Sequence, residues 1–192
     1  LTANACNIDV IGFKHGFNGL LEQEFQTLHP HHIDNIIQRG GTILKSAHCP
    51  AMEQPDGPVK AAAILDQLNI DALIVIGGDG SFRGTMAISK HYRGQLIGVP
   101  GTIDNDVDGT DTTIGFATAI DTALDAIDKI RDTADAFERI FLVELMGRHS
   151  GYLSLAAGIA GGAEQIICPE FGKLDADNLN TIITPIKHAQ LL

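Results

Sequence analysis

Short apolar runs and amphipathic segments alternate along the chain. Apolar runs that stop at glycine, proline or polar clusters predict strands, and apolar positions three or four residues apart predict helices. The predicted strands are residues 8–13, 71–76, 95–99, 139–145 and 165–168. The predicted helices are residues 31–38, 59–68, 82–91, 114–131, 152–160 and 175–188. Strands that alternate with helices are typical of an α/β protein with a doubly wound, mostly parallel sheet.

Three of these segments carry most of the fold prediction. The run at 71–76 is apolar without alternation, which predicts a strand covered on both faces and hence a parallel sheet. The helix at 59–68 is expected to bury Val59, Ala62, Ala63, Leu65 and Leu68. The helix at 114–131, which Thr112 or Thr113 is expected to cap, has an apolar stripe of Phe116, Ile120, Ala123, Leu124, Ile127 and Ile130.

The length allows one large domain or a domain and part of a second, since the chain has 192 residues. Apolar residues make up 44% of the chain, which is enough for a sizeable core. The long predicted helix could pass from one lobe to another. We therefore place a boundary near Gly115, with one lobe at 1–114 and a second at 115–192.

Charge and cysteine usage narrow the class of protein. The net charge of -11 disfavours nucleic-acid binding, and it means that an anionic substrate needs a locally positive pocket. The three cysteines, Cys6, Cys49 and Cys168, have no CxxC spacing and predict reduced thiols in the cytoplasm. Apolar runs are too short for a membrane span. The first residue is not Met, so we expect the natural start to lie upstream.

The first motif with chemical meaning is GGDGS at residues 77–81, between a predicted strand and a predicted helix. Glycines let a backbone approach a phosphate closely, and a helix N-terminus offers free N–H groups to it. Asp79 could hold a Mg²⁺ ion that bridges the phosphates. The alternative is a strand-to-helix turn without a ligand. By itself the motif would also fit lipid kinases and NAD kinase.

The second motif is PGTIDND at residues 100–106, again directly after a predicted strand. Of two nearby carboxylates, one can deprotonate an attacking hydroxyl while the other binds metal, which is what phosphoryl transfer requires. The loop at 101–113 contains Asp104, Asp106, Asp108 and Asp111. The alternative is a polar turn whose side chains bond the local backbone.

Three motifs in order carry a resemblance to a known family. GGDGS, PGTIDND and MGRHSGYLSLAAGIAGGAE follow one another with a spacing that matches from about Ile8 to Glu170. Together they resemble the phosphofructokinase family, of the ATP-dependent type. The resemblance implies a Rossmann-like nucleotide-binding lobe at 1–114 and part of a sugar-phosphate-binding lobe at 115–192. It also implies a cytoplasmic, glycolytic homo-oligomer, with a tetramer typical of the family.

The resemblance implies transfer of the terminal phosphoryl group of ATP to the 1-hydroxyl of fructose 6-phosphate. Asp104 would be the catalytic base and Thr102 would stabilise the transferring group, and both would contact the sugar phosphate. Asp79 and Asp106 would lie on the side of the Mg²⁺ ion. The residues implied to bind ATP are Gly78, Asp79, Gly80, Ser81, Gly84 and His48.

The implied sugar-phosphate contacts are Met146, Gly147 and Arg148, together with Arg139 from a neighbouring subunit. An arginine is the positive group that an acidic protein needs for this ligand; alone, it could also be a surface charge. Two further residues, Arg131 and Glu164, match effector-site positions of the family. His48 departs from the pattern, because many bacterial members have an arginine there, and Pro30 falls near another family arginine.

Two alternatives remain open within the same fold. Pyrophosphate-dependent members resemble GGDD and PKTIDND, whereas this chain has Gly80 and Gly101, which favours ATP. A non-catalytic subunit or fragment is the other alternative, since the family has further chain ahead of Leu1 and beyond Leu192. We expect a protein of only these residues to be inactive. The histidines His29, His31 and His32 lack metal-ligand spacing, and we do not expect them to bind a metal.

Overall fold

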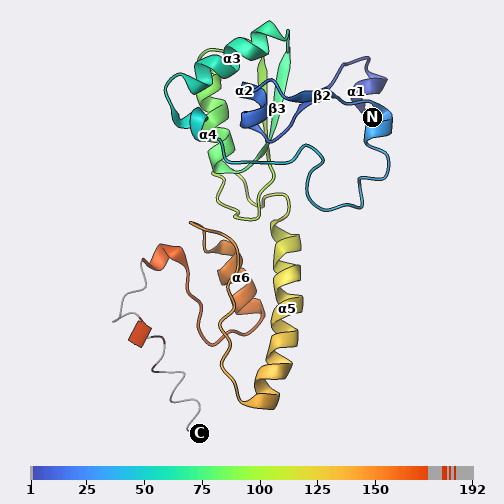
Figure 1. Cartoon of the computed structure of the whole chain (residues 1–192). Coiled ribbons are helices and arrows are strands. Elements are labelled where there is room, and N and C mark those ends of the chain that lie inside the picture. The colour runs from blue at the N-terminus through green and yellow to red at the C-terminus, as the bar shows by residue number, and fades with distance from the viewer. Residues whose placement is uncertain (1, 173–178, 181, 183, 185–192) are drawn as a thin grey trace. The chain divides into compact units, whose positions relative to one another are not determined.

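A computed structural model describes residues 2–172, 179, 180, 182 and 184. The chain divides into two compact units (Figure 1). Unit 1 contains Leu1–Val75 and Gly80–Gly98, and unit 2 contains Ile76–Asp79 and Val99–Leu192. The helix predicted at 175–188 falls mostly outside the described residues.

The described elements alternate between strands and helices, as an α/β protein requires. The α-helices are α1 (Thr2–Ala5), α2 (Phe17–Leu21), α3 (Gly57–Gln67), α4 (Asp79–Ile88), α5 (Phe116–Phe137) and α6 (Tyr152–Ala160). The strands are β1 (Ile11–Phe13), β2 (Phe25–Thr27), β3 (Ala72–Gly77) and β4 (Gln95–Pro100). Three short 3₁₀ helices are η1 (Pro30–His32), η2 (Pro50–Glu53) and η3 (Pro169–Phe171).

Strands β3 and β4 pair in parallel, as the sequence predicted. At one end Gln95 N–H donates to Asp71 O (2.9 Å), and at the other Gly101 N–H donates to Gly77 O (3.0 Å). The sequence separation is the same at both ends, so the strands run in the same direction and both finish at the same edge. Residues of β3 alternate between exposed and half-buried, so the prediction that both faces are covered was wrong. Strands β1 and β2 form a separate antiparallel pair. Strand β1 lies within the predicted strand at 8–13, whereas β2 was not predicted.

The core of unit 1 lies between α2, α3 and α4, beside β3. Its fully buried side chains include Leu20, Leu65 and Ile88. Helix α3 begins two residues earlier than predicted, and its buried face is Gly57, Pro58, Ala61, Ala62 and Leu65. The buried face of α3 is turned toward η2 and α2. Val59 and Ala63, which were expected to be buried, therefore lie on the exposed side of the helix.

The core of unit 2 forms where α5 packs against α6 (Figure 1). Ala123, Leu153 and Ala157 are buried, and the predicted stripe of α5 is otherwise half-buried. The predicted cap of α5 was wrong, because Gly115 is the N-cap, at φ 102°, and no side chain caps the helix. At the start of α6, Gly151 N–H donates to the Glu170 carboxylate (2.7 Å).

Three predicted elements are absent from the described part of the chain. Residues 31–38 contain only the 3₁₀ turn η1 and bends, without a helix. Residues 139–145 and 165–168 are irregular, and Leu142 is 88% exposed. Apolar sequence fits a strand, but a strand exists only where a neighbour completes its hydrogen-bond ladder. No described strand pairs with either segment.

Neither disulfides nor membrane spans feature among the described residues. Cys6, Cys49 and Cys168 are all free thiols, and the latter two are buried. No described helix combines the length and the apolar character that crossing a membrane would need.

Candidate functional site

The glycine turn after β3 is very short. Strand β3 ends at Gly77 and helix α4 begins at Asp79, so Gly78 alone separates them. The sequence predicted a later helix start, at residue 82, whereas the structure places Asp79, Gly80 and Ser81 in the first turn of α4. Their N–H groups belong to the part of a helix that lacks intrahelical acceptors and can bind anions.

Two glycines of this turn differ in what surrounds them. A Cβ atom at Gly78 would lie 3.2 Å from Thr102 Cβ and 3.3 Å from Thr102 Oγ1. A Cβ atom at Gly80 would meet nothing within 4 Å. Gly78 therefore lets the loop after β4 approach the end of β3, while Gly80 leaves open space beside the first turn of α4.

The loop after β4 is held by hydrogen bonds from its own side chains. Thr113, only 3% exposed, donates from Oγ1 to Thr102 O (2.6 Å) and from its N–H to Asn105 Oδ1 (2.9 Å). Asp104 N–H donates to Thr102 Oγ1 (3.2 Å). Asn105 has a left-handed backbone at φ 53°, which asparagine tolerates better than most residues. These bonds fix the segment that contains the two predicted catalytic residues, Thr102 and Asp104.

A second segment of unit 2 is tied to this loop. Ser150, 4% exposed, donates from Oγ to Asp104 O (2.6 Å), and its N–H donates to Gly147 O (2.8 Å). Gly147 has φ 144°, and a Cβ atom there would lie 2.3 Å from Ser150 O, so glycine is required. The structure thereby brings the predicted sugar-phosphate segment, Met146 to Arg148, next to the predicted base.

The electrostatics of the loop favour a proton acceptor at Asp104. Burial raises the pKa of the Asp104 carboxyl, and the charge of nearby Asp106 raises this pKa further. Asp106 itself is exposed. A carboxylate with a raised pKa holds a proton more firmly, which makes it a better general base as long as it is ionised at the working pH.

The residues present fit a magnesium ion that also binds phosphate. The described residues contain no group of three or more histidine, cysteine or acidic side chains arranged for a metal. Mg²⁺ needs no such group, because it usually takes one or two carboxylates and completes its shell with phosphate oxygens and water. Asp106, one of the two predicted magnesium ligands, is exposed, and its charge raises the pKa of Asp104; a cation beside Asp106 would relieve that repulsion.

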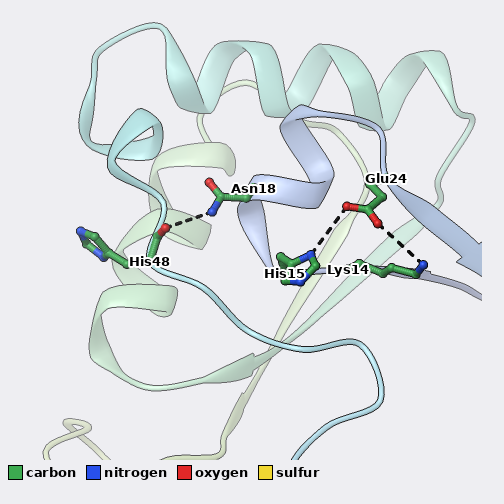
Figure 2. Close-up of polar contacts among 5 residues, drawn as sticks. All are labelled: Lys14, His15, Asn18, Glu24 and His48. Carbon is green, nitrogen blue, oxygen red and sulfur yellow. Dashed lines mark hydrogen bonds and ion pairs between the residues drawn. The ribbon is translucent and has the colours of Figure 1, made fainter.

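His48 lies in unit 1 with an exposed imidazole. Asn18 Nδ2 donates to His48 O (3.0 Å), as Figure 2 shows. The imidazole Nε2 lies 3.5 Å from Glu53 Oε1. In the same region the Glu24 carboxylate pairs with Lys14 Nζ (3.7 Å) and His15 Nδ1 (3.6 Å). The backbone of His48 is therefore anchored while its side chain remains accessible.

Other predicted site residues have structural contacts of their own. A Cβ atom at Gly84 would lie 2.8 Å from Phe17 Cε2, so this glycine permits α4 to pack on α2. Arg131 Nη1 donates to Gly161 O (2.5 Å) and Gly162 O (2.7 Å), at the C-terminal end of α6. The Arg139 guanidinium lies 5.0 Å from the centre of the Phe137 ring. Glu164 and Arg148 are exposed.

Sequence reasoning missed Ser150, Asn105 and Thr113 as residues that hold the site. The sequence predicts a role for Thr113 only as a helix cap, and Ser150 lies in the third motif without a predicted role. The only signal in the sequence is that these polar residues lie within or beside the motifs. In the structure, Thr113 and Ser150 are two of the three buried polar residues that are described. Ser150 and Asp104 are 46 residues apart, and Thr113 binds residues across an irregular loop, so neither pairing was predictable from local pattern.

The fold is that of an α/β protein with a parallel sheet, and a strand that turns through glycine into a helix is the arrangement that many phosphate-binding α/β proteins share. Residues 1–190 match the family described as Phosphofructokinase. The chain belongs to the phosphofructokinase family, as its three motifs indicated.

Relatives of known name agree with this assignment. The chain is 49% identical over 168 residues to ATP-dependent 6-phosphofructokinase 1 of Thermus thermophilus. The aligned region covers 88% of this chain and 52% of that protein. It is 47% identical over 190 residues to the ATP-dependent 6-phosphofructokinase of Clostridium botulinum, and this alignment covers 98% of the chain and 59% of that protein. The chain thus spans just over half the length of these curated relatives.

Solved structures show the same α/β fold with a parallel sheet. Phosphofructokinase from Saccharomyces cerevisiae superposes with a TM-score of 0.77 at 30% identity, over 97% of this chain and 29% of that one. A pyrophosphate-dependent phosphofructokinase from Marinobacter aquaeolei superposes with a TM-score of 0.70 at 24% identity, over 90% and 47%. The latter likeness concerns the fold alone.

Proposed function

We propose that this chain forms part of an ATP-dependent 6-phosphofructokinase. The reaction is transfer of the terminal phosphoryl group of ATP to the 1-hydroxyl of fructose 6-phosphate, which gives fructose 1,6-bisphosphate in glycolysis. The observation that carries the proposal is a half-buried carboxylate, Asp104, fixed in a loop at the end of a parallel strand. The names of the relatives support the choice of donor and acceptor.

In this proposal Asp104 accepts the proton of the sugar 1-hydroxyl as that oxygen attacks. Burial and the charge of Asp106 raise the pKa of Asp104, which makes its ionised form a stronger base. Thr102, whose Oγ1 accepts the Asp104 N–H, lies beside the base and stabilises the phosphoryl group in transit.

The ATP phosphates lie at the glycine turn and the N-terminus of α4. Gly78, Gly80 and Ser81 provide backbone N–H groups there, while His48 and Gly84 complete the proposed nucleotide contacts. Asp79 and Asp106 would hold Mg²⁺, which neutralises phosphate charge during transfer.

The sugar phosphate is bound by Met146, Gly147 and Arg148. The guanidinium of Arg148 provides the positive charge that an acidic protein must place locally for an anionic ligand. Arg139 acts from a neighbouring subunit, which makes the enzyme a homo-oligomer with shared sites, in the form of a tetramer. Arg131 and Glu164 serve an effector site, and the enzyme acts in the cytoplasm.

The two lobes of the proposal divide the work at Gly115. Residues 1–114 bind the nucleotide and residues 115–192 contribute part of the sugar-phosphate site. The side-chain ties around Asp104 connect these tasks within unit 2, because Ser150 follows the proposed sugar-phosphate segment and reaches the backbone of the base.

The choice of ATP over pyrophosphate is supported by two glycines. Gly80 has open space around it, which leaves room for the α-phosphate of a nucleotide. At Gly101 a Cβ atom would lie 2.9 Å from Ile76 Cγ2, so the larger side chain of a pyrophosphate-type motif would meet Ile76. The test is the turnover rate of the full-length protein with each donor; faster turnover with pyrophosphate would overturn the assignment.

The central test replaces Asp104 in the full-length protein. We expect Asp104→Asn to lower kcat for fructose 6-phosphate by roughly 10²–10⁴-fold, the usual contribution of a general base. Thermal shift with ATP and with fructose 6-phosphate should show that both ligands still bind. Unchanged kcat in this variant would refute the proposed mechanism, and absence of sugar phosphorylation by the unaltered protein would refute the proposed function.

A further inference from the structure

We infer that Ser150 and Thr113 are positioning residues, whose buried hydroxyls hold the backbone of the proposed catalytic residues Asp104 and Thr102. This inference rests on the function proposed above, and it assigns to the two hydroxyls a part in the reaction rather than in folding alone. Neither hydroxyl touches a reacting atom; each acts through a main-chain carbonyl.

The first contact involves Thr113 and the start of the loop. Thr113 Oγ1 donates to Thr102 O at 2.6 Å, a short bond between neutral groups. Its N–H donates to Asn105 Oδ1, so one buried residue reaches both sides of Asp104. Because Asp104 lies between these two anchors, its main chain has little freedom to move.

The second contact involves Ser150 and Asp104 itself. Ser150 Oγ donates to Asp104 O at 2.6 Å. The same residue donates its N–H to Gly147 O, inside the segment proposed to bind the sugar phosphate. Ser150 therefore sets the spacing between the base and the residues that hold its substrate, which is the distance on which proton transfer depends.

Burial makes these two hydroxyls difficult to replace. Thr113 is 3% and Ser150 is 4% exposed, so water has little access to the two hydroxyls. A loop lacks the backbone ladder of a strand, and its carbonyls must find side-chain donors instead. Removal of either hydroxyl leaves a carbonyl without its donor and lets the loop relax toward other partners.

The test compares variants with and without each hydroxyl in the full-length protein. We expect Ser150→Ala and Thr113→Val each to lower kcat about tenfold or more, since small displacements of reacting groups have effects of this size. The KM values for ATP and fructose 6-phosphate should change by less than about threefold. Thr113→Ser keeps the hydroxyl and should restore most of the kcat that Thr113→Val loses.

The matched control is Thr122→Val on α5. Thr122 Oγ1 also donates to a main-chain carbonyl, Thr118 O (2.9 Å). Thr122 is exposed, and this bond lies within helix α5 and not in the loop after β4. This variant should keep both kcat and KM. Thermal denaturation of each variant shows whether it is folded, and Ser150→Cys, with a weaker donor of similar size, provides a second test at position 150.

The outcomes separate this inference from the proposed function. Normal kcat in folded Ser150→Ala and Thr113→Val overturns the positioning role, as does a Thr113→Ser variant that is as impaired as Thr113→Val. If Asp104→Asn is inactive in the same experiment, the proposed function stands while the positioning role fails. If Asp104→Asn keeps normal kcat, Asp104 is not the base and the positioning role fails with it; the proposed function itself fails only if the unaltered protein does not phosphorylate the sugar.

Discussion

The turn after β3 and the loop after β4 begin at the same edge of a parallel pair, yet they are shaped by different means. The first is a single linking residue, Gly78, before helix α4. The second runs from Gly101 to Gly115 and is fixed by hydroxyl and amide side chains. Glycine provides close approach where the chain needs to be short, and side-chain hydrogen bonds provide rigidity where it is long.

The two segments contribute different things to the proposed site. The turn offers backbone N–H groups and open space, which suits a bound phosphate. The loop offers carboxylates whose positions are fixed, which suits proton transfer. Substitutions in the loop should therefore affect the chemical step, whereas substitutions in the turn should affect the fit between segments.

The largest expected effect concerns the charge of Asp104. The pKa of this carboxyl is raised in the folded protein by burial and by Asp106, so the folded state favours the protonated form. The ionised group therefore opposes folding above its folded pKa, and this penalty disappears as the pH falls. We expect Asp104→Asn, besides losing kcat, to raise the thermal midpoint at pH 7, and the difference should vanish near pH 3.

The control for that prediction is Asp108→Asn, which removes a charge from an exposed part of the same loop. Its thermal midpoint at pH 7 should stay near that of the unaltered protein. A lower midpoint for Asp104→Asn than for Asp108→Asn would show that the ionised Asp104 carboxylate stabilises the fold, and a raised pKa for that carboxyl would then be wrong.

The next effect compares the same substitution at two glycines of the turn. In Gly78→Ala the new Cβ meets Thr102, so the loop must shift by a few tenths of an ångström, and kcat should fall about tenfold. In Gly80→Ala the Cβ meets nothing, and replacing glycine inside a helix should raise the unfolding free energy by roughly 0.5–1 kcal/mol. Steady-state kinetics measures kcat, and denaturant unfolding measures the unfolding free energy of each variant.

A stability gain in Gly80→Ala would indicate that glycine at this position serves the ligand and not the fold. Equal losses of stability in both variants would contradict the contrast between a crowded Gly78 and an open Gly80.

A smaller effect is expected at Asn105, which combines a left-handed backbone with an acceptor for Thr113 N–H. Asn105→Ala loses both properties and should lower the unfolding free energy by about 1–2 kcal/mol. Asn105→Gly loses only the acceptor and should lose less. Chemical denaturation of the two variants checks the order; a glycine variant less stable than the alanine variant would show that backbone strain is not the issue.

The smallest effect is expected far from both segments, at the exposed pair of Lys129 and Asp125 on α5. The side chains are four residues apart and largely solvated, so Lys129→Ala should change the unfolding free energy by less than about 0.5 kcal/mol. Denaturant unfolding in low and high salt measures it. A loss above about 1 kcal/mol would mean that surface ion pairs matter in this protein as much as the buried hydroxyls.

The sequence predicted most elements that are recognisable from local pattern. Helices α3, α4, α5 and α6 and strands β3 and β4 all fall close to their predicted ranges, because their apolar periodicity is clear. The strands predicted at 139–145 and 165–168 failed, since a strand depends on a neighbour that its own sequence does not contain. The buried face of α3 was misplaced because periodicity does not fix which side meets η2.

The candidate site was predicted in part. Motif order led to the family, and the family match confirms that interpretation. The roles of Asp104, Asp79 and Arg148 stay predictions. What the sequence could not provide is the set of contacts from Thr113 and Ser150. The first depends on the path of an irregular loop, and the second joins residues 46 positions apart, so both follow from the tertiary structure.

The bond from Thr113 to Asn105 also divides the long loop into two parts. The residues between Asn105 and Thr113 form a closed arc, because the bond joins its two ends. Within the arc, Thr110 N–H donates to Val107 O (3.2 Å), and Gly109 has φ 76°. An extra residue beside Gly109 would enlarge only this outer arc, because the closure lies behind it. A residue could therefore be added to this arc, or a fluorescent label attached to it, without displacing Asp104.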